Sequence, residues 1–186
     1  DDMALAGATI RSSGIVNLRT RSDSRALIVG GSDDSAGLAL STPELATVTA
    51  GTLSLGHTGH TGAFSVSATP ATTGIGALEL LSSSLSLGSA ITGLLETFLN
   101  AGKDAIVQTA GSLTVTDSIA KSAGGDATLT LRAGSDLSFS SAVGASSSSN
   151  KLSMDFTGGY STTGTLNTSG TGTFTSNGGT IGFTGR

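Results

Sequence analysis

The chain has 186 residues, of which 28 are glycine, 37% are hydrophobic and 12% are charged, with a formal net charge of −4. This length suits one domain, and the small acidic charge argues against nucleic-acid binding, which favours a basic surface. There is no cysteine, and no apolar run reaches the roughly 18 residues of a membrane-spanning helix. Disordered chains combine low hydrophobicity with high net charge, so we expect a folded chain.

Short alternating apolar runs begin near the N-terminus. Val16 and Leu18 recur at i+22 in a Leu-Ala-Leu run at 38–40, and Val29 recurs at i+24 as Leu53. Alternate side chains of a strand point to opposite faces, so each run predicts a strand with one apolar face. We expect these runs to stack on one another in successive coils.

The alternating pattern continues in the next part of the chain. Leu53 and Leu55 recur at i+25 as Leu78 and Leu80, with a further apolar run at 64–66. Segments rich in Gly, Ser, Thr, Asp or Pro predict the joining turns. These segments are 30–37, 41–44, 56–63 and 68–74.

Residues 89–107 interrupt the strand pattern. Their apolar residues fall at the i, i+3, i+4, i+7 and i+8 positions of a helical stripe. The stripe consists of Ile91, Leu94, Leu95, Phe98 and Leu99. The spacing predicts a short helix near 92–100, capped by Thr92, ended by 100–102 and lying over an outer face. An irregular coil with the same apolar residues turned inward is the alternative.

The clearest repeat spans residues 111–156. Leu113 and Val115 recur at i+24 as Leu137 and Phe139, and Ile119 recurs at the same interval as Val143. Leu129 and Leu131 recur at i+23 as Leu152 and Met154. We expect these ten side chains to be buried, with Leu113 beside Leu137 and Leu131 beside Met154. A period of this length predicts a solenoid, in which each coil buries its apolar face against its neighbours.

The last part of the chain is still richer in Gly and Thr. Leu166, Phe174, Ile181 and Phe183 continue the inward positions, and Ser-Asn-Gly-Gly at 176–179 predicts a turn before the last strand. Residues 1–10 and 174–186 carry strand-like apolar residues, Leu5 and Ile10 among them, and no capping helix. We therefore expect open strand edges at both ends, covered by further repeats or by another copy of the chain.

Two segments of the chain carry a family resemblance. They are GSLTVTDSIAKSAGGDATLTLRAGSDLSFSSAVGASSSSNKLSMDF (111–156) and ALSTPELATVTAGTLSLGHTGHTGAFSVSA (39–68). The chain, from about residue 4 to 186, resembles the repeat region of filamentous haemagglutinin-like, two-partner-secreted bacterial adhesins. The resemblance implies a right-handed parallel β-helix, export through an outer-membrane secretion partner, and a role in attachment or aggregation. The NPNG and NPNL motifs of that family's secretion domain are absent, so the export role does not carry over.

Candidate sites for chemistry are sparse. His57 and His60 are the only histidines, and a zinc site needs three or four ligands, so we interpret them as a solvated loop. Asp33 and Asp34 suggest calcium, but the repeating calcium-binding nonapeptide is absent and a polar turn is the preferred interpretation. No G-x-S-x-G motif accompanies the histidines. The sequence predicts no catalytic, cofactor-binding or metal-ligating residue, no cofactor and no enzymatic activity.

Two surface patterns suggest ligands. Arg11, Arg19, Arg21 and Arg25 form the only basic concentration, which suits an anionic glycan or simply a solubilising edge. Thr-x-Thr occurs in three places, at 114–116, 128–130 and 171–175, and a flat threonine array can bind ice. The spacing between these places is uneven, which weakens that hypothesis.

Together these observations predict an all-β, right-handed parallel β-helix (β-solenoid) of about eight coils of 22–25 residues, a single repeat segment over 1–186. We expect a structural shaft segment of a secreted bacterial cell-surface adhesin or extracellular fibre. Its expected partners are copies of itself or further repeats, cell-surface glycans and, through the resemblance alone, an outer-membrane secretion partner. The alternatives are a carbohydrate-binding or carbohydrate-cleaving β-helix and an ice-binding solenoid. Carbohydrate cleavage would require paired carboxylates assembled across coils.

Overall fold

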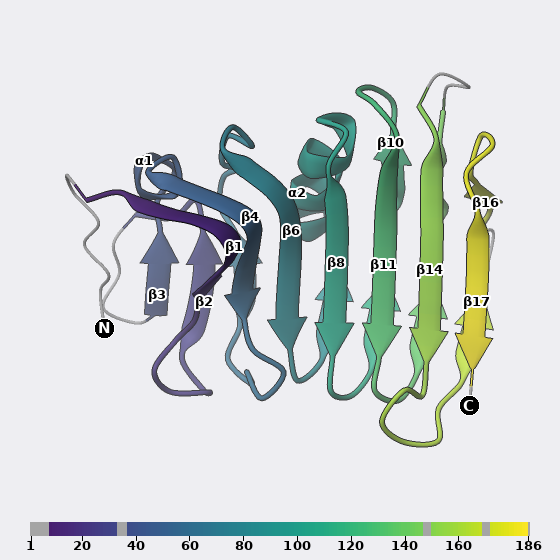
Figure 1. Ribbon diagram of the computed structural model, residues 1–186. Coiled ribbons are helices and arrows are strands. Elements are labelled where there is room, and N and C mark those ends of the chain that lie inside the picture. Colours follow the sequence, from purple (N-terminus) through teal and green to yellow (C-terminus); the bar gives the residue numbers. More distant parts are fainter. Residues whose placement is uncertain (1–7, 33–36, 147–149, 169–171, 186) are drawn as a thin grey trace.

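In the computed structural model the chain forms a β-solenoid whose strands stack side by side (Figure 1). The structure describes residues 8–32, 37–146, 150–168 and 172–185. In the view of Figure 1 the front strands run downward, and the chain returns upward behind them while it progresses from left to right. The coil is therefore right-handed, and the predicted right-handed parallel β-helix is confirmed.

One long sheet forms the front wall of the solenoid. Its seven strands all pair in parallel. In order they are β1 (Ile10–Leu18), β4 (Val48–Gly56), β6 (Ile75–Ser82), β8 (Asp104–Thr109), β11 (Ala127–Ala133), β14 (Leu152–Gly158) and β17 (Ile181–Gly185).

Three shorter parallel sheets complete the walls. The first contains β7 (Leu85–Leu87), β9 (Leu113–Val115), β12 (Leu137–Phe139) and β15 (Leu166–Thr168). The second contains β10 (Ile119–Lys121), β13 (Val143–Ala145) and β16 (Phe174–Thr175). The third, at the N-terminal end, contains β3 (Gly37–Leu40), β2 (Ala26–Val29) and β5 (Phe64–Val66).

The core is built from ladders of like positions on successive coils. One ladder of the long sheet is Val16, Leu53, Leu78, Ala105, Leu129, Met154 and Ile181. The adjacent ladder is Leu18, Leu55, Leu80, Val107, Leu131, Phe156 and Phe183. The ten side chains predicted to be buried within 113–154 are each at most 2% exposed, which confirms that prediction. The turn predicted at 176–179 is also present, with Asn177 and Gly178 at φ 50° and 92°.

The predicted register is right at one position and wrong at another. Leu113 pairs with Leu137 as expected. Leu131, however, pairs with Phe156, and Met154 pairs with Leu129. Residues of β11 therefore pair with their i+25 partners in β14, and not with the i+23 partners that the sequence pattern suggests. A shift of two residues leaves every side chain on the same face of the strand, so the alternating pattern alone does not distinguish the two registers.

The N-terminal coil is longer than predicted. Val16 pairs with Leu53, its i+37 partner, and the run at 38–40 pairs instead with β2. Val29 pairs with Val66 and not with Leu53. The strands β2 and β3 and the one-turn helix α1 (Thr42–Leu45) lie between β1 and β4 and lengthen this step. The solenoid has about five turns, fewer than the eight predicted.

The predicted helix exists, but its position differs from the prediction. Helix α2 (Ser89–Asn100) begins after Gly88, so Thr92 is not its cap, and the alternative of an irregular coil is wrong. The helix follows β7 and precedes β8, which is the place that β10 and β13 occupy in the next two coils (Figure 1). Its apolar stripe is buried in the core. The helix thus replaces a strand in the wall and does not lie over an outer face.

Polar side chains of α2 satisfy the edge of the sheet that the helix interrupts. Glu96 Oε1 accepts a hydrogen bond from the backbone N–H of Ala120 (2.7 Å), the middle residue of β10. Asn100 Oδ1 accepts from the N–H groups of Ser122 (2.7 Å) and Ala123 (3.0 Å). In return, the buried Lys121 Nζ donates to the Leu99 carbonyl at the C-terminal end of the helix (2.6 Å). These hydrogen bonds satisfy backbone groups that would otherwise pair with a neighbouring strand or remain unpaired at the helix end.

Candidate functional site

The C-terminal coil carries the most exposed apolar ladder residues. Ile181 and Phe183 of β17 are 38% and 49% exposed, although they occupy the inward positions of their ladders. Leu166 and Phe174 on the other walls of this coil are only partly buried. One coil earlier, Phe156 is fully buried. Among the described residues no coil lies over β17, which accounts for this exposure.

A cluster of phenylalanines holds the exposed side chains in place. Phe156 lies between Phe139 and Phe183, with ring centroids 4.9 and 5.5 Å away. Phe174 contacts Phe183 edge to face at 5.3 Å. Phe183 is thus packed against Phe156 and Phe174 on one side and exposed on the other.

The backbone edge of β17 is also open. The Met154 N–H donates to the Thr180 carbonyl (2.8 Å), and β17 is the last strand of its sheet. In a parallel ladder the N–H and C=O groups of alternate residues point to opposite sides. Those of Ile181 and Phe183 therefore point away from β14, where they are available to a further strand.

At the N-terminal end the apolar side chains of the outermost strands are buried. Val16 and Leu18 of β1, and Leu38 and Leu40 of β3, are all at most 8% exposed. Next to them, Ser41 and Glu44 form a capping box that starts α1, and Leu45 of that helix is buried. The apolar side chains are therefore covered at this end, but β1 and β3 are the outermost strands of their sheets, so the predicted open strand edge is not contradicted here. Leu5 lies outside the described residues.

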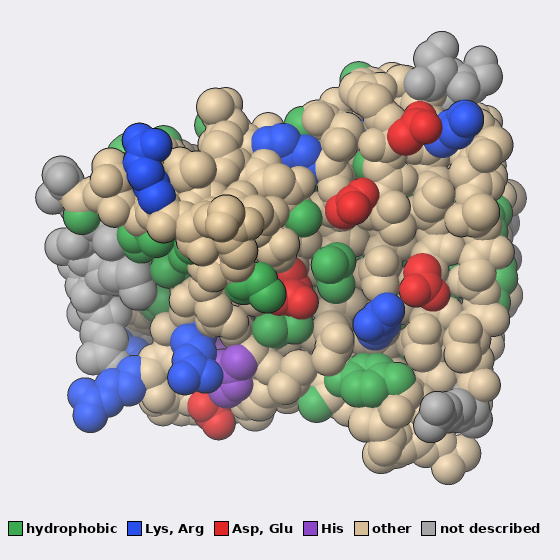
Figure 2. All heavy atoms as spheres, viewed as in Figure 1, with side chains coloured by type: hydrophobic (Ala, Val, Ile, Leu, Met, Phe, Trp, Pro, Cys, Tyr) green, Lys and Arg blue, Asp and Glu red, His purple; other side chains and the backbone are tan. Residues whose placement is uncertain are grey.

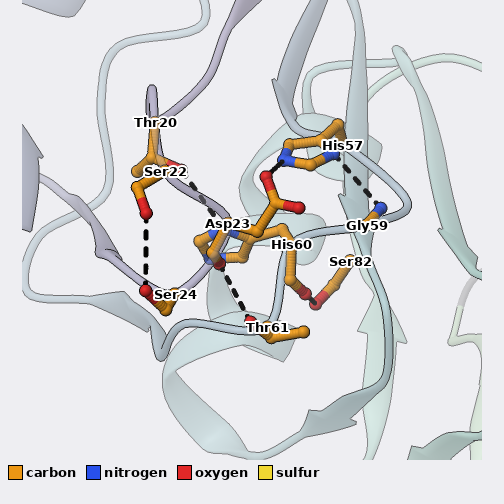
Figure 3. Close-up of polar contacts among 9 residues, drawn as sticks. All are labelled: Thr20, Ser22, Asp23, Ser24, His57, Gly59, His60, Thr61 and Ser82. Carbon is orange, nitrogen blue, oxygen red and sulfur yellow. Dashed lines mark hydrogen bonds and ion pairs between the residues drawn. The ribbon is translucent and has the colours of Figure 1, made fainter.

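The two histidines lie in the loop that joins β4 to β5, against the loop that joins β1 to β2 (Figure 3). His57 Nε2 is 3.2 Å from Asp23 Oδ1. His60 is completely buried, so the interpretation of a solvated loop is wrong for this residue. Over the ranges that the structure describes, no three His, Asp or Glu side chains gather in a group able to hold a metal ion.

The other candidate residues are dispersed. Arg19 and Arg21 are exposed on either side of the buried Thr20, as their alternation predicts. The threonines at 114, 128–130 and 173–175 belong to three different walls and do not form one flat array. Figure 2 shows the charged side chains scattered over the face of the long sheet, with no large cluster of one sign among the described residues. Asp33 and Asp34 lie outside the described residues.

Several aspartates have a structural role that the sequence analysis missed. Asp104 Oδ1 and Asp126 Oδ1 accept hydrogen bonds from the backbone N–H groups of Thr128 (2.7 Å) and Lys151 (3.3 Å), each about one coil ahead. Asp136 Oδ1 accepts from both the hydroxyl and the N–H of Thr165 (2.8 Å each), and these bonds hold the pKa of Asp136 below its ordinary value. The signal was a recurrent Asp at or just before the start of a strand.

One open groove of about 510 Å³ lies beside the edge strand β7. It is lined by Phe64, Leu85 and the small residues of 61–63, 84–86, 112 and 114. None of its lining residues is acidic. The groove therefore lacks the paired carboxylates that glycoside hydrolysis requires.

The fold defines the chain as a β-solenoid. Comparison with known proteins adds no relative: no family model matches the chain, and neither the curated proteins nor the solved structures yield a match. In the part of the chain that the structure describes, neither helix has the length and apolar character needed to cross a membrane.

Proposed function

We propose that this chain is a structural shaft segment of a secreted bacterial adhesin or extracellular fibre. The observation that carries the proposal is the C-terminal coil, which presents a regular strand edge and two inward-ladder side chains without a cover. A further coil can continue both ladders of the long sheet from Ile181 and Phe183 in the same register. The resemblance of 39–68 and 111–156 to filamentous haemagglutinin-like repeats supports extracellular attachment or aggregation as the setting.

The arrangement of polar groups also favours a structural role. The carboxylates of Asp104, Asp126 and Asp136 accept backbone N–H groups from the following coil, and Glu96 does the same at β10. These acids tie consecutive coils together through hydrogen bonds to the backbone. In our proposal the chain has no enzymatic activity, and its partners are further coils of the same kind.

The proposal is tested by negative-stain electron microscopy of the purified chain at several concentrations. We expect rods of constant width whose length increases with concentration, since an open coil extends along the solenoid axis. Compact particles of one size at every concentration would argue against a shaft. Adhesion is tested separately, by measuring whether beads coated with the chain bind to cells and whether added soluble chain competes.

A further inference from the structure

The loop at 57–62 connects three consecutive coils. The backbone N–H groups of Thr61 and Gly62 both donate to the Asp23 carbonyl (2.8 Å each), which belongs to the preceding coil. The Ser83 N–H (2.8 Å) and the Ser82 hydroxyl (3.0 Å), which belong to the following coil, both donate to the His60 carbonyl. This loop therefore links the first coil to the next two, in addition to the strand pairing of β1 with β4 and of β2 with β5 (Figure 3).

The two imidazoles in this loop have different surroundings. His57 Nδ1 accepts from the Gly59 N–H (3.2 Å), while its Nε2 lies 3.2 Å from the Asp23 carboxylate. The side chain of His57 is 23% exposed, so water and a counter-charge are both available to it. His60 is 0% exposed, and its Nδ1 lies 3.4 Å from the Thr20 hydroxyl. Its Nε2 is buried without a hydrogen-bond partner.

A proton added to His60 would create a charge on a side chain that has no exposure to solvent. Burial without compensation disfavours the charged form of an ionisable group. Burial, and secondarily the neighbouring His57, lower the pKa of His60 below its ordinary value of 6.5, while the Ala63 backbone and Asp23 oppose this more weakly. Ala63 and Asp23 raise the pKa of His60 only while the loop is docked, because only then do they lie close to its imidazole.

The charged and titratable groups around His60 come from two segments. Its own loop supplies His57, whose ring centroid is 6.2 Å away. The loop at 19–25 supplies Asp23, and Arg25 of that loop has its backbone against Gly62. Ser82, the last residue of β6, also contacts this loop but is uncharged. Asp23 is the only anion in this set, and His57 already occupies one of its carboxylate oxygens.

We propose that this junction is an acid-sensitive latch: protonation of His60 releases the loop at 57–62 from both neighbouring coils and loosens the first coil, while the later coils stay closed. The undocked imidazole gains water and regains the ordinary proton affinity of histidine. The latch does not depend on the shaft proposal, because it follows from the contacts of this loop alone.

The sign of the pH dependence follows from proton binding. The closed form binds a proton less readily than the open form, so acid shifts the equilibrium toward the open form. Opening begins to increase as the pH falls below the ordinary value of 6.5 and levels off below the lowered pKa of the closed form. Within that window the population of the open form rises by at most about tenfold per pH unit.

The test is amide hydrogen exchange of the whole chain between pH 5 and pH 8, expressed as protection factors. The reporters are the N–H groups of Thr61, Gly62 and Ser83, whose bonds form the latch. We expect their protection to fall toward pH 5 by up to about tenfold per pH unit, while the amide of Leu137 in a later coil keeps its protection. Equal reporter protection at pH 5 and pH 8 would overturn the proposal.

Two substitutions separate the histidines. The His60→Asn variant has no titrating group at the buried position, so we expect its reporters to show no acid-induced opening. In His57→Asn we expect the opening to remain. Persistence of the opening in His60→Asn, or its loss only in His57→Asn, would contradict the assignment. The ¹³Cε1 chemical shifts of the two histidines, followed against pH in the wild-type chain, provide a test that requires no substitution in the core. A pKa of His60 at or above 6.5 in that titration would refute the latch.

Discussion

Substitution of Asn100 tests whether α2 replaces a strand through its side chains. In Asn100→Ala the N–H groups of Ser122 and Ala123 lose the acceptor that lies 2.7 and 3.0 Å away. Each lost bond costs about 0.5–1.5 kcal/mol, so the pair contributes about 1–3 kcal/mol. Both N–H groups are on exposed residues that water reaches, and alanine favours the helix by up to about 0.7 kcal/mol. We therefore expect a net loss of about 1 kcal/mol from the free energy of unfolding.

Urea denaturation measures this loss, and hydrogen exchange locates it at residues 122 and 123. Asn100→Asp keeps an oxygen acceptor and should retain most of the stability. Thr97→Ala is the matched control, because the Thr97 hydroxyl donates only to Gly93 of the same helix (2.8 Å). Unchanged stability and unchanged exchange at both amides in Asn100→Ala would refute the strand-replacement account.

Three further predictions concern the core, a turn and metal ions. Leu137→Asp places an unpaired charge at a fully buried position and should lower the free energy of unfolding, measured by urea denaturation, by more than about 3 kcal/mol. Ser138→Asp, on the outward side of the same strand, should lower it by less than about 1 kcal/mol. Gly56→Ala should lower the melting temperature, since Gly56 has φ +84° and an added Cβ would lie 2.4 Å from the Leu81 carbonyl oxygen. Gly93→Ala, with nothing within 4 Å of the added Cβ, should instead stabilise α2 by about 0.5–1 kcal/mol. Addition of EDTA should leave the melting temperature unchanged, and a shift of many degrees would reveal a bound metal.

The alternation of apolar and polar residues was sufficient to predict the fold class and the core. A two-residue period places Leu113, Val115 and their repeats on one face whatever the loop lengths are. The helical stripe was also visible, because its spacing at 91–99 differs from that of a strand. Both patterns depend only on residues close together in the sequence, so they predict the element correctly even where the strand register is predicted wrongly.

Properties that depend on which segments become neighbours could not be predicted in this way. The sequence does not reveal that the run at 38–40 pairs with β2 while Val16 pairs with Leu53, because several apolar runs fit each position. The burial of His60 likewise results from the packing of two loops from different coils. Similarly, the role of Asn100 emerges only once β10 lies beside the helix.

The central claim is that the C-terminal coil is a face built to receive another coil. Sedimentation equilibrium over a wide range of concentrations tests it most directly, with the wild-type chain and the Ile181→Lys/Phe183→Lys double variant measured in parallel. We predict an average mass that rises with concentration for the wild-type chain and the monomer mass for the variant, whose charges block strand addition. A wild-type chain that stays monomeric at the highest concentration, with the amides of β16 and β17 protected from exchange, would contradict the claim.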